Sequence, residues 1–260
     1  MHVSPRFPAA VRAALVRVVA AGSLCVILNT TAYAQEPATE KAATKEAVAV
    51  SADSAESKGE STKPKKAVID KTKSILKGRI TLKGTPPKPR KIQITKDPEI
   101  CSANGTTLVD TEVGKDGAVA NVVVVIEKVQ PEDGKSWEWN HPKSGYVMRQ
   151  KNCSFKPYTL VIPRGENLTV HNDDPVSHNV NTGEWNVMQA AGSEPIVKPV
   201  NSKRPLRIGC NVHSWMEGWI YPIDNPFFAM TDKKGNFEII NVPPGKYRVV
   251  AWHSNLGRKR

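Results

Sequence analysis

The chain has 260 residues, of which 39% are hydrophobic, with a formal net charge of +12 and four cysteines. This length accommodates one or two ordinary domains. No uncharged apolar stretch of 18 residues occurs after the first 40 positions, which excludes a polytopic helical membrane protein. Four cysteines are too few for a fold held together by disulfides. The basic clusters at 63–66 and 258–260 lack a helical basic stripe or a stacking aromatic motif, so we do not expect nucleic-acid binding.

Residues 1–34 have the pattern of a secretory signal peptide. Three arginines precede a short apolar run, Val18–Thr31, and the following Ala-Tyr-Ala places small residues three and one positions before a cut after Ala34. The apolar run is shorter than the roughly 20 residues that span a bilayer, which disfavours an uncleaved anchor. A lipoprotein reading would use Cys25, but the preceding leucine fits that signal poorly. We therefore expect cleavage after Ala34 and a periplasmic, secreted or cell-surface protein.

Residues 35–74 consist mainly of Ala, Glu, Lys, Ser and Thr, with almost no aromatic or large aliphatic side chain. Such a segment cannot bury enough apolar surface to offset the entropy lost on ordering. The sequence predicts a disordered linker here.

From about residue 75 the pattern changes to short β-strands separated by turns, and no stretch shows a convincing helical period. Turn signals such as Lys234-Gly235 and Pro243-Pro244-Gly245 punctuate the chain. The β-branched run Val122–Ile126 suits a strand buried on both faces. This pattern predicts an all-β fold, an antiparallel sandwich or barrel. The expected strands cover 78–84, 118–129, 158–163, 167–171, 205–210, 218–223, 236–240 and 246–252.

One group of residues carries chemistry. Cys210, His213 and Met216 place a thiolate, an imidazole and a thioether within seven residues, just after an expected strand. His178, in the segment Asn172-Asp-Asp-Pro-Val-Ser-His-Asn, adds a second imidazole at another strand end. Two histidines, one cysteine and a distant methionine are the donor set of a blue-copper electron-transfer site. We interpret His141, His171 and His253 as ordinary structural histidines.

The motif Phe155-Lys-Pro-x3-Val-x3-Gly-x2-Leu-x-Val-x-Asn172-x-Asp-x3-His178-Asn179 resembles the plastocyanin and azurin group, the cupredoxins. The Cys-x2-His-x2-Met spacing is similar to that of amicyanin. The resemblance covers about residues 118–223, and it implies a Greek-key β-sandwich with one type 1 copper ion bound by His178, Cys210, His213 and Met216. We expect the copper domain to span residues 75–225. It also implies that Asn179 steadies the cysteine loop. If this loop lies at the surface, His213 is the expected exit for the electron.

The segment Thr231–Val249 resembles the carboxypeptidase-regulatory-like, prealbumin-type β-sandwiches through its Asp-x2-Gly and Pro-Pro-Gly turns. We expect residues 226–260, with 77–95 as a candidate first part, to form this second unit. The copper region would then be fused to it or inserted in it. This order of parts resembles exported bacterial methylamine-utilisation or plastocyanin-like proteins.

Cysteine parity gives a conditional prediction. Removal of the leader leaves Cys101, Cys153 and Cys210, and an exported protein meets oxidising conditions in which an available pair closes. If Cys210 is the metal thiolate, Cys101 and Cys153 are left to form a disulfide. The alternative pairs, Cys153–Cys210 and Cys101–Cys210, would remove the thiolate and abolish the copper site.

Three functions compete at this point. The first is a copper electron carrier that is not an enzyme and exchanges electrons with an unidentified redox protein, which could be membrane-associated. The second is copper binding for storage, delivery or sensing without redox turnover. The third is a copper-free β-sandwich that serves as an interaction module and uses its cysteines for disulfides.

Overall fold

The computed structural model describes residues 24–27, 66–67, 74–131 and 135–260. Most of the expected leader, its cleavage site and nearly all of the expected linker lie outside these ranges. Of the leader, only β1 (Leu24–Ile27) is described, and it pairs antiparallel with β3 (Ser74–Leu82). No helix within the described ranges is long and apolar enough to cross a membrane.

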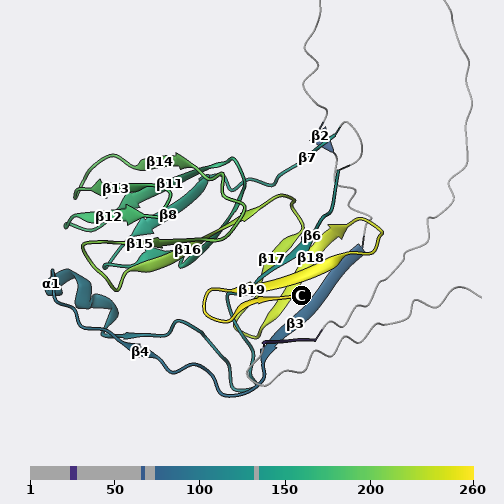
Figure 1. Cartoon of the computed structure of the whole chain (residues 1–260), viewed down its shortest axis with the longest axis horizontal. Helices are drawn as coiled ribbons and strands as arrows, with labels where there is room; N and C mark the ends of the chain where they lie inside the picture. The colour runs from purple at the N-terminus through teal and green to yellow at the C-terminus, as the bar shows by residue number, and fades with distance from the viewer. Residues whose placement is uncertain (1–23, 28–65, 68–73, 132–134) are drawn as a thin grey trace, which may run out of the picture.

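The described chain is almost entirely β-structure, as the sequence predicts (Figure 1). The remaining strands are β2 (Lys66–Ala67), β4 (Arg90–Lys91), β5 (Thr107–Leu108), β6 (Val123–Glu127), β7 (Ser136–Trp137), β8 (Tyr146–Gln150), β9 (Phe155–Lys156), β10 (Thr159–Pro163), β11 (Asn167–Asn172), β12 (His178–Asn181), β13 (Asn186–Gln189), β14 (Ile196–Pro199), β15 (Leu206–Gly209), β16 (Glu217–Ile223), β17 (Phe228–Met230), β18 (Asn236–Val242), β19 (Arg248–His253) and β20 (Gly257–Lys259). The helical elements are α1 (Pro98–Cys101) and the 3-10 turn η1 (Ser102–Asn104).

The first sandwich contains the expected copper motif. Its five-stranded sheet has the order β10-β16-β15-β12-β13, and its four-stranded sheet has the order β14-β11-β8-β9. Parallel pairs, β10 with β16 and β8 with β11, occur in both sheets among antiparallel neighbours. Alternating apolar residues from the two sheets meet in one core that includes Met148, Leu168, Ile208 and Ile220, all fully buried.

The second sandwich joins chain segments that are far apart in sequence. One sheet has the order β17-β6-β19-β20, and the other has the order β1-β3-β18. The expected turn at Lys234-Gly235 connects β17 to β18, and Gly235 has φ +74°. A Cβ at this position would lie 2.4 Å from the carbonyl oxygen of Ile80, so the close approach to β3 requires glycine.

The position of β6 differs from the expected grouping. Residues 118–129 were expected in the copper region, whereas β6 pairs with β17 and β19 of the C-terminal segment. The expectation of burial on both faces is confirmed: Val124 and Ile126 face the core of the second sandwich, while Val123 and Val125 face the first sandwich. An uninterrupted β-branched run specifies burial but carries no signal for the partner strand.

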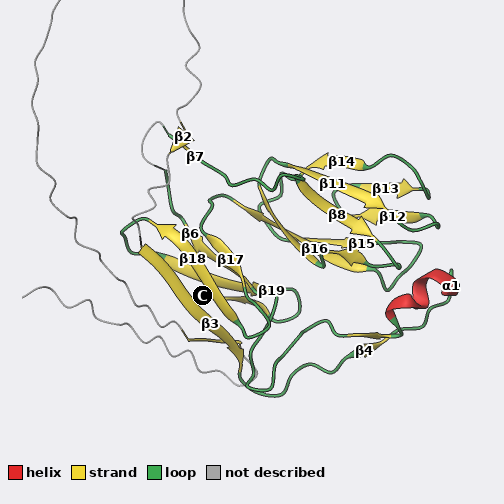
Figure 2. Ribbon diagram, turned by 180° about the vertical axis from the view of Figure 1, so that it is seen from behind, coloured by secondary structure: helices red, strands yellow, loops and turns green. Residues whose placement is uncertain are grey.

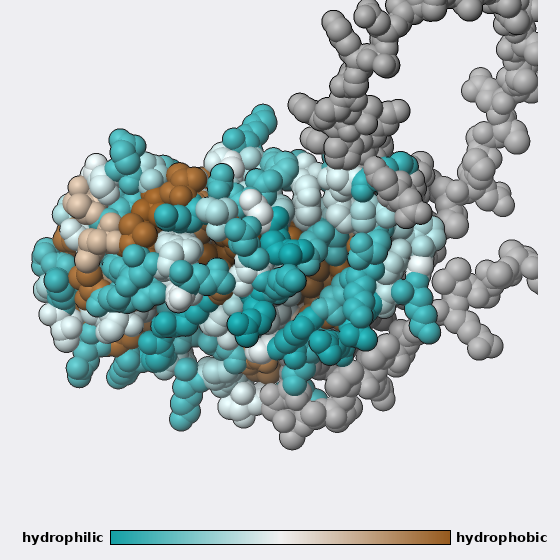
Figure 3. Space-filling model, turned by 45° about the horizontal axis from the view of Figure 1, so that its top comes forward, coloured by the Kyte–Doolittle hydropathy of each residue, from teal (hydrophilic) through white to brown (hydrophobic). Residues whose placement is uncertain are grey.

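A third apolar cluster packs the two sandwiches together. Val161 on β10 and Tyr221 and Ile223 on β16 meet Val250 and Trp252 on β19. The Trp252 ring lies 5.1 Å from that of Tyr221 and 5.4 Å from that of Trp219, between ring centroids. The two sandwiches therefore share a buried aromatic contact. On the outer face shown in Figure 3, hydrophilic residues predominate and hydrophobic ones form narrow patches.

Between β3 and β6 the chain makes a long excursion. Figures 1 and 2 show β4 and α1 leaving the second sandwich and reaching the opposite end of the first sandwich. This excursion delivers Asp97 and Cys101 to the end of the sandwich where the copper motif lies.

Candidate metal centre

Three of the four expected ligands come from one short loop between β15 and β16. Cys210 follows directly after β15. Its backbone N–H donates to the carbonyl of Met216 (3.3 Å), and the N–H of Met216 donates to the carbonyl of His213 (2.9 Å). These bonds fold the loop back on itself, so all three residues lie at the same end of the first sandwich.

The fourth expected ligand, His178, begins β12. The turn before it is held by Asn172, whose Oδ1 accepts from the N–H of Asp174 (3.1 Å) and whose Nδ2 donates to the carbonyl of Val176 (2.8 Å). An asparagine that bonds to the backbone two residues on is typical of a tight turn. β12 then pairs with β15 at Asn181 and Gly209, which places His178 beside the cysteine loop.

The nitrogen and sulfur donors converge in the interior. The Nδ1 atoms of His178 and His213 lie 3.0 Å apart, and the Sγ of Cys210 lies 3.8 Å from the Nδ1 of His213. Both histidines are fully buried, and Cys210 is nearly so. Bonds of about 2.0 Å to nitrogen and about 2.3 Å to thiolate require donors of a shared metal ion to lie within about 4 Å of one another. The two measured separations meet this requirement.

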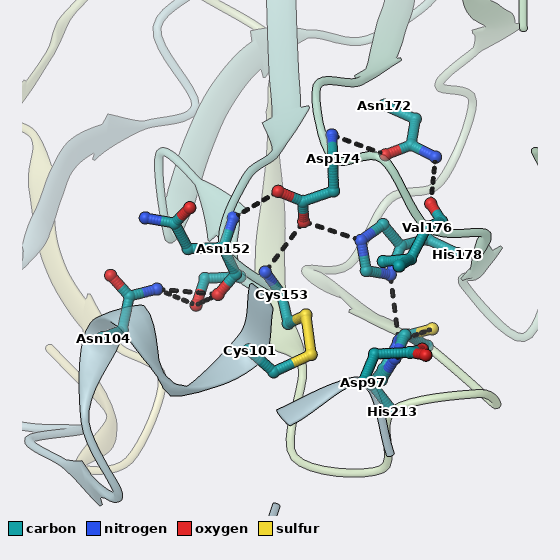
Figure 4. The surroundings of a disulfide bond; sticks show 12 residues. Asp97, Cys101, Asn104, Asn152, Cys153, Asn172, Asp174, Val176, His178 and His213 are labelled. Atoms are coloured by element: carbon teal, nitrogen blue, oxygen red, sulfur yellow. Dashed lines mark hydrogen bonds and ion pairs between the residues drawn. A yellow bond between two sulfur atoms is a disulfide. The ribbon is translucent and has the colours of Figure 1, made fainter. Parts of the chain in front are cut away.

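Each histidine also contacts a carboxylate. The Nε2 of His178 lies 2.8 Å from Oδ2 of Asp174, and the Nε2 of His213 lies 2.8 Å from Oδ2 of Asp97 (Figure 4). A neutral imidazole has one N–H and one lone pair. Because a carboxylate accepts a hydrogen bond, it favours a proton on Nε2 of each ring, and the Nδ1 lone pairs then face each other. Two lone pairs at this distance are stabilised by a shared proton or by a metal ion bound to both.

The electrostatics of His178 favour its neutral form. Burial lowers the pKa of His178, and the neighbouring His213 lowers it further, while hydrogen bonding to Asp174 opposes the shift. A neutral imidazole keeps its lone pair, and only a lone pair can bind a metal ion.

Asn179 contacts the cysteine loop through both its backbone and its side chain. Its backbone N–H donates to the Sγ of Cys210 (3.3 Å), and its Oδ1 accepts from the backbone N–H of Asn211 (3.0 Å). These are the contacts expected of a residue that steadies this loop.

Met216 belongs to the same core as Cys210 and is 2% exposed. A surface hollow of about 620 Å³ is lined in part by Cys210 and Met216. Met216 therefore lies in the same loop as Cys210 and His213, and its residue borders this hollow.

Cys101 and Cys153 form a disulfide, and Cys210 is a buried free thiol. The predicted pairing is confirmed, and the two alternatives that would consume Cys210 are wrong. The disulfide sulfurs lie close to the histidines: one group of donor atoms within 4.8 Å of each other comprises Cys101, Cys153 and His213.

His213 does not reach the surface, in contrast to its expected role as the electron exit. Its side chain is 0% exposed because Asp97 covers Nε2 and Trp215 packs against the ring, with centroids 5.3 Å apart. The expectation assumed an exposed loop, and the excursion that carries Asp97 closes this side.

Sequence reasoning missed both carboxylates. Asp174 stands inside the motif quoted for the first sandwich, four residues before His178, and a search for carboxylates near the histidine would have found it. Asp97 lies 116 residues before His213 in the chain. No local pattern connects them, and only the path of the excursion brings them together.

No protein-family model and no curated protein matches this chain. Among solved structures, amicyanin from Paracoccus versutus is 16% identical over 38% of this chain and 97% of its own, with a TM-score of 0.28. A purple cupredoxin from Nitrosopumilus maritimus is 19% identical over 30% of this chain and 99% of its own, with a TM-score of 0.27.

A copper-containing nitrite reductase from Thermus scotoductus is 18% identical over 30% of this chain, with a TM-score of 0.27. That match spans only 22% of the reductase. The resemblance of Thr231–Val249 to carboxypeptidase-regulatory-like sandwiches stays a prediction.

Proposed function

We propose that this protein is an exported single-copper electron carrier in which His178, Cys210, His213 and Met216 bind the metal ion. The observation that carries the proposal is the buried convergence of two Nδ1 atoms and one thiol, with both Nε2 atoms in contact with carboxylates. A set of soft and intermediate donors of this kind suits copper in both of its oxidation states.

Bound copper would supply one-electron redox chemistry. The chain contributes a donor set whose positions are fixed before the metal arrives. Strand pairing holds the start of β12, the backbone bonds of the loop hold Cys210 and Met216, and the carboxylates fix both imidazole tautomers. Donors that cannot move change little between oxidation states, which keeps the reorganisation cost of electron transfer low.

The surface hollow offers a route for exchange with a partner. It is lined by Cys210 and other residues of the same loop, while the His213 side chain is fully buried. We infer that an exported redox protein, free or membrane-associated, docks at this hollow. The expected leader supports export, and N-terminal sequencing of the mature protein would test cleavage after Ala34.

Copper(II) titration followed by visible absorption tests the proposal. The wild type should bind one copper ion and develop an intense band at the red end of the visible spectrum, because a Cu(II)–thiolate bond gives strong charge transfer. Cys210→Ser should lose the band, since oxygen is a harder donor. Ser214→Ala, an exposed change in the same loop, is the matched control and should keep it. A copper-loaded but colourless wild type would refute the blue-copper assignment.

The cover over His213 favours a second candidate, copper storage or sensing without redox turnover. A buried metal ligand slows the access of a redox partner and of solvent to the metal ion. Cyclic voltammetry separates the candidates: an electron carrier gives a reversible couple and fast self-exchange, whereas a storage protein binds copper without rapid turnover.

A further inference from the structure

The segment between β3 and β6 places the carboxylate of Asp97 in contact with His213. The backbone of Asp97 is in the left-handed region, with φ 48°, and its carbonyl accepts from the N–H groups of Ile100 (3.1 Å) and Cys101 (2.9 Å). These bonds fix Asp97 at the start of α1. Its Oδ2 then lies 2.8 Å from the Nε2 of a histidine that has no exposed surface.

The position of this segment is secured by two further attachments. The Cys101–Cys153 disulfide ties α1 to the turn before β9. The side chain of Asn104 donates to the carbonyl of Asn152 (2.8 Å) and to the hydroxyl of Ser154 (3.0 Å). Residues 97–104 are therefore fastened to the first sandwich on the side of the metal centre.

The same attachments lead back to the other histidine. The backbone N–H of Cys153 donates to Oδ2 of Asp174 (2.9 Å), and this oxygen also contacts the Nε2 of His178. Figure 4 shows these contacts: Asp97 lies against His213, and His213 against His178. Asp174 lies between His178 and the turn that holds the disulfide. Both histidines therefore contact carboxylates whose own backbone contacts lie close to the disulfide.

We propose that Asp97 is a positioning residue of the metal centre and that its side chain, held in place by the nearby disulfide, covers the Nε2 edge of His213. This inference rests on the proposed function. Asp97 accepts a hydrogen bond from the Nε2–H group of His213. This bond fixes the plane of the ring and leaves Nδ1 as the atom that binds the metal. Its negative charge lies beside the metal centre and stabilises Cu(II), the more highly charged ion, relative to Cu(I). The cover also keeps water from the ring edge.

Asp97→Asn removes the negative charge and keeps the hydrogen bond, because the amide oxygen can still accept from Nε2–H in the same space. The Cu(II) affinity should fall roughly tenfold, in the range for outer partners of metal-bound histidines. With Cu(I) affinity unchanged, the reduction potential should rise by about 59 mV. The control is Glu99→Gln, which removes an exposed charge two residues away. Equal shifts in both variants would overturn the proposal, because they would reflect only long-range charge.

A copper-free measurement tests the positioning role separately. Nitrogen-15 NMR of the metal-free wild type should show a proton on the Nε2 of His213 that exchanges slowly with water. Asp97→Ala should speed this exchange at least tenfold, whereas Glu99→Gln should leave it unchanged. A bare Nε2 in the wild type, or rapid exchange, would overturn the proposal. If the wild type binds no copper, the proposed function fails and this NMR result still decides the role of Asp97.

Discussion

Oδ2 of Asp174 lies 2.8 Å from the Nε2 of His178, and both oxygens of this carboxylate are hydrogen-bonded. Oδ1 accepts from the N–H of Asn152 (2.7 Å), and Oδ2 also accepts from the N–H of Cys153 (2.9 Å). The group is buried, so none of these donors has water as a substitute. The side chain of Asp174 thus connects a histidine of the candidate centre to the turn that carries Cys153.

Asp174→Asn should lower the free energy of unfolding by about 1–3 kcal/mol. One carboxylate oxygen, which accepts a hydrogen bond, would be replaced by an amide NH2 that faces the same donor. Urea unfolding of the metal-free protein measures this. The control is the adjacent Asp173→Asn, which removes only a surface ion pair with Arg149 and should cost about 0–1 kcal/mol. Equal losses for the two variants would show that the buried bonds of Asp174 contribute little.

The Cys101–Cys153 disulfide should stabilise the fold and leave the donor set intact. The bridge spans 52 residues of sequence. Replacing both cysteines by serine should lower the free energy of unfolding by about 2–5 kcal/mol, because the unfolded chain gains freedom. The red absorption band should persist, since Cys210 is unchanged. Denaturant curves and a visible spectrum of the double variant test both points. Loss of the band with normal folding would show that the bridge itself is needed for copper binding.

Met216→Ala should distinguish the contribution of this side chain to core packing from its effect on the reduction potential of bound copper. The metal-free variant should lose about 2–5 kcal/mol of stability, since a buried side chain is removed. The copper form should keep its colour and change its potential, because an axial thioether bond is weak. Met188→Ala is the matched control: Met188 is 61% exposed, and its loss should change stability by no more than about 0.5 kcal/mol. An uncoloured Met216→Ala protein would mean that the thioether holds the metal and does not merely tune it.

His253 should make the fold sensitive to acid. Burial lowers the pKa of His253 to about 4, and its Nδ1 accepts from the backbone N–H of Asn255 (3.2 Å). Between about pH 6.5 and pH 4 the unfolded state binds a proton that the folded state does not. Stability should therefore be constant above pH 6.5 and fall by about 1.4 kcal/mol per pH unit below it, about 3 kcal/mol in all.

His253→Asn, whose Oδ1 can take over as acceptor, should remove this part of the slope. Urea midpoints of the two proteins between pH 4 and pH 7.5 give the comparison, and the site histidines cancel because both proteins contain them. His171→Asn, at a partly exposed position, is the control. Parallel stability curves for the wild type and His253→Asn would contradict the prediction.

The residues of the candidate site could be predicted from the sequence where they lie close together in the chain. Cys210, His213 and Met216 lie in one loop, and their spacing identifies a donor set without knowledge of the fold. His178 was recognisable because it follows a turn pattern at a strand end. The β-branched run at Val122–Ile126 likewise indicated burial on both faces, because that property depends only on the run itself.

Tertiary structure decided everything that depends on which distant segments meet. The partner strands of β6 are set by packing against both sandwiches, and apolar side chains do not specify a neighbour. The contact of Asp97 with His213 spans 116 residues and depends on an excursion anchored by a disulfide. Sequence alone therefore predicted the candidate donors of this centre, through local spacing. The fold determined which histidine nitrogen is free and which side of the centre is closed, because these follow from contacts between segments far apart in the chain.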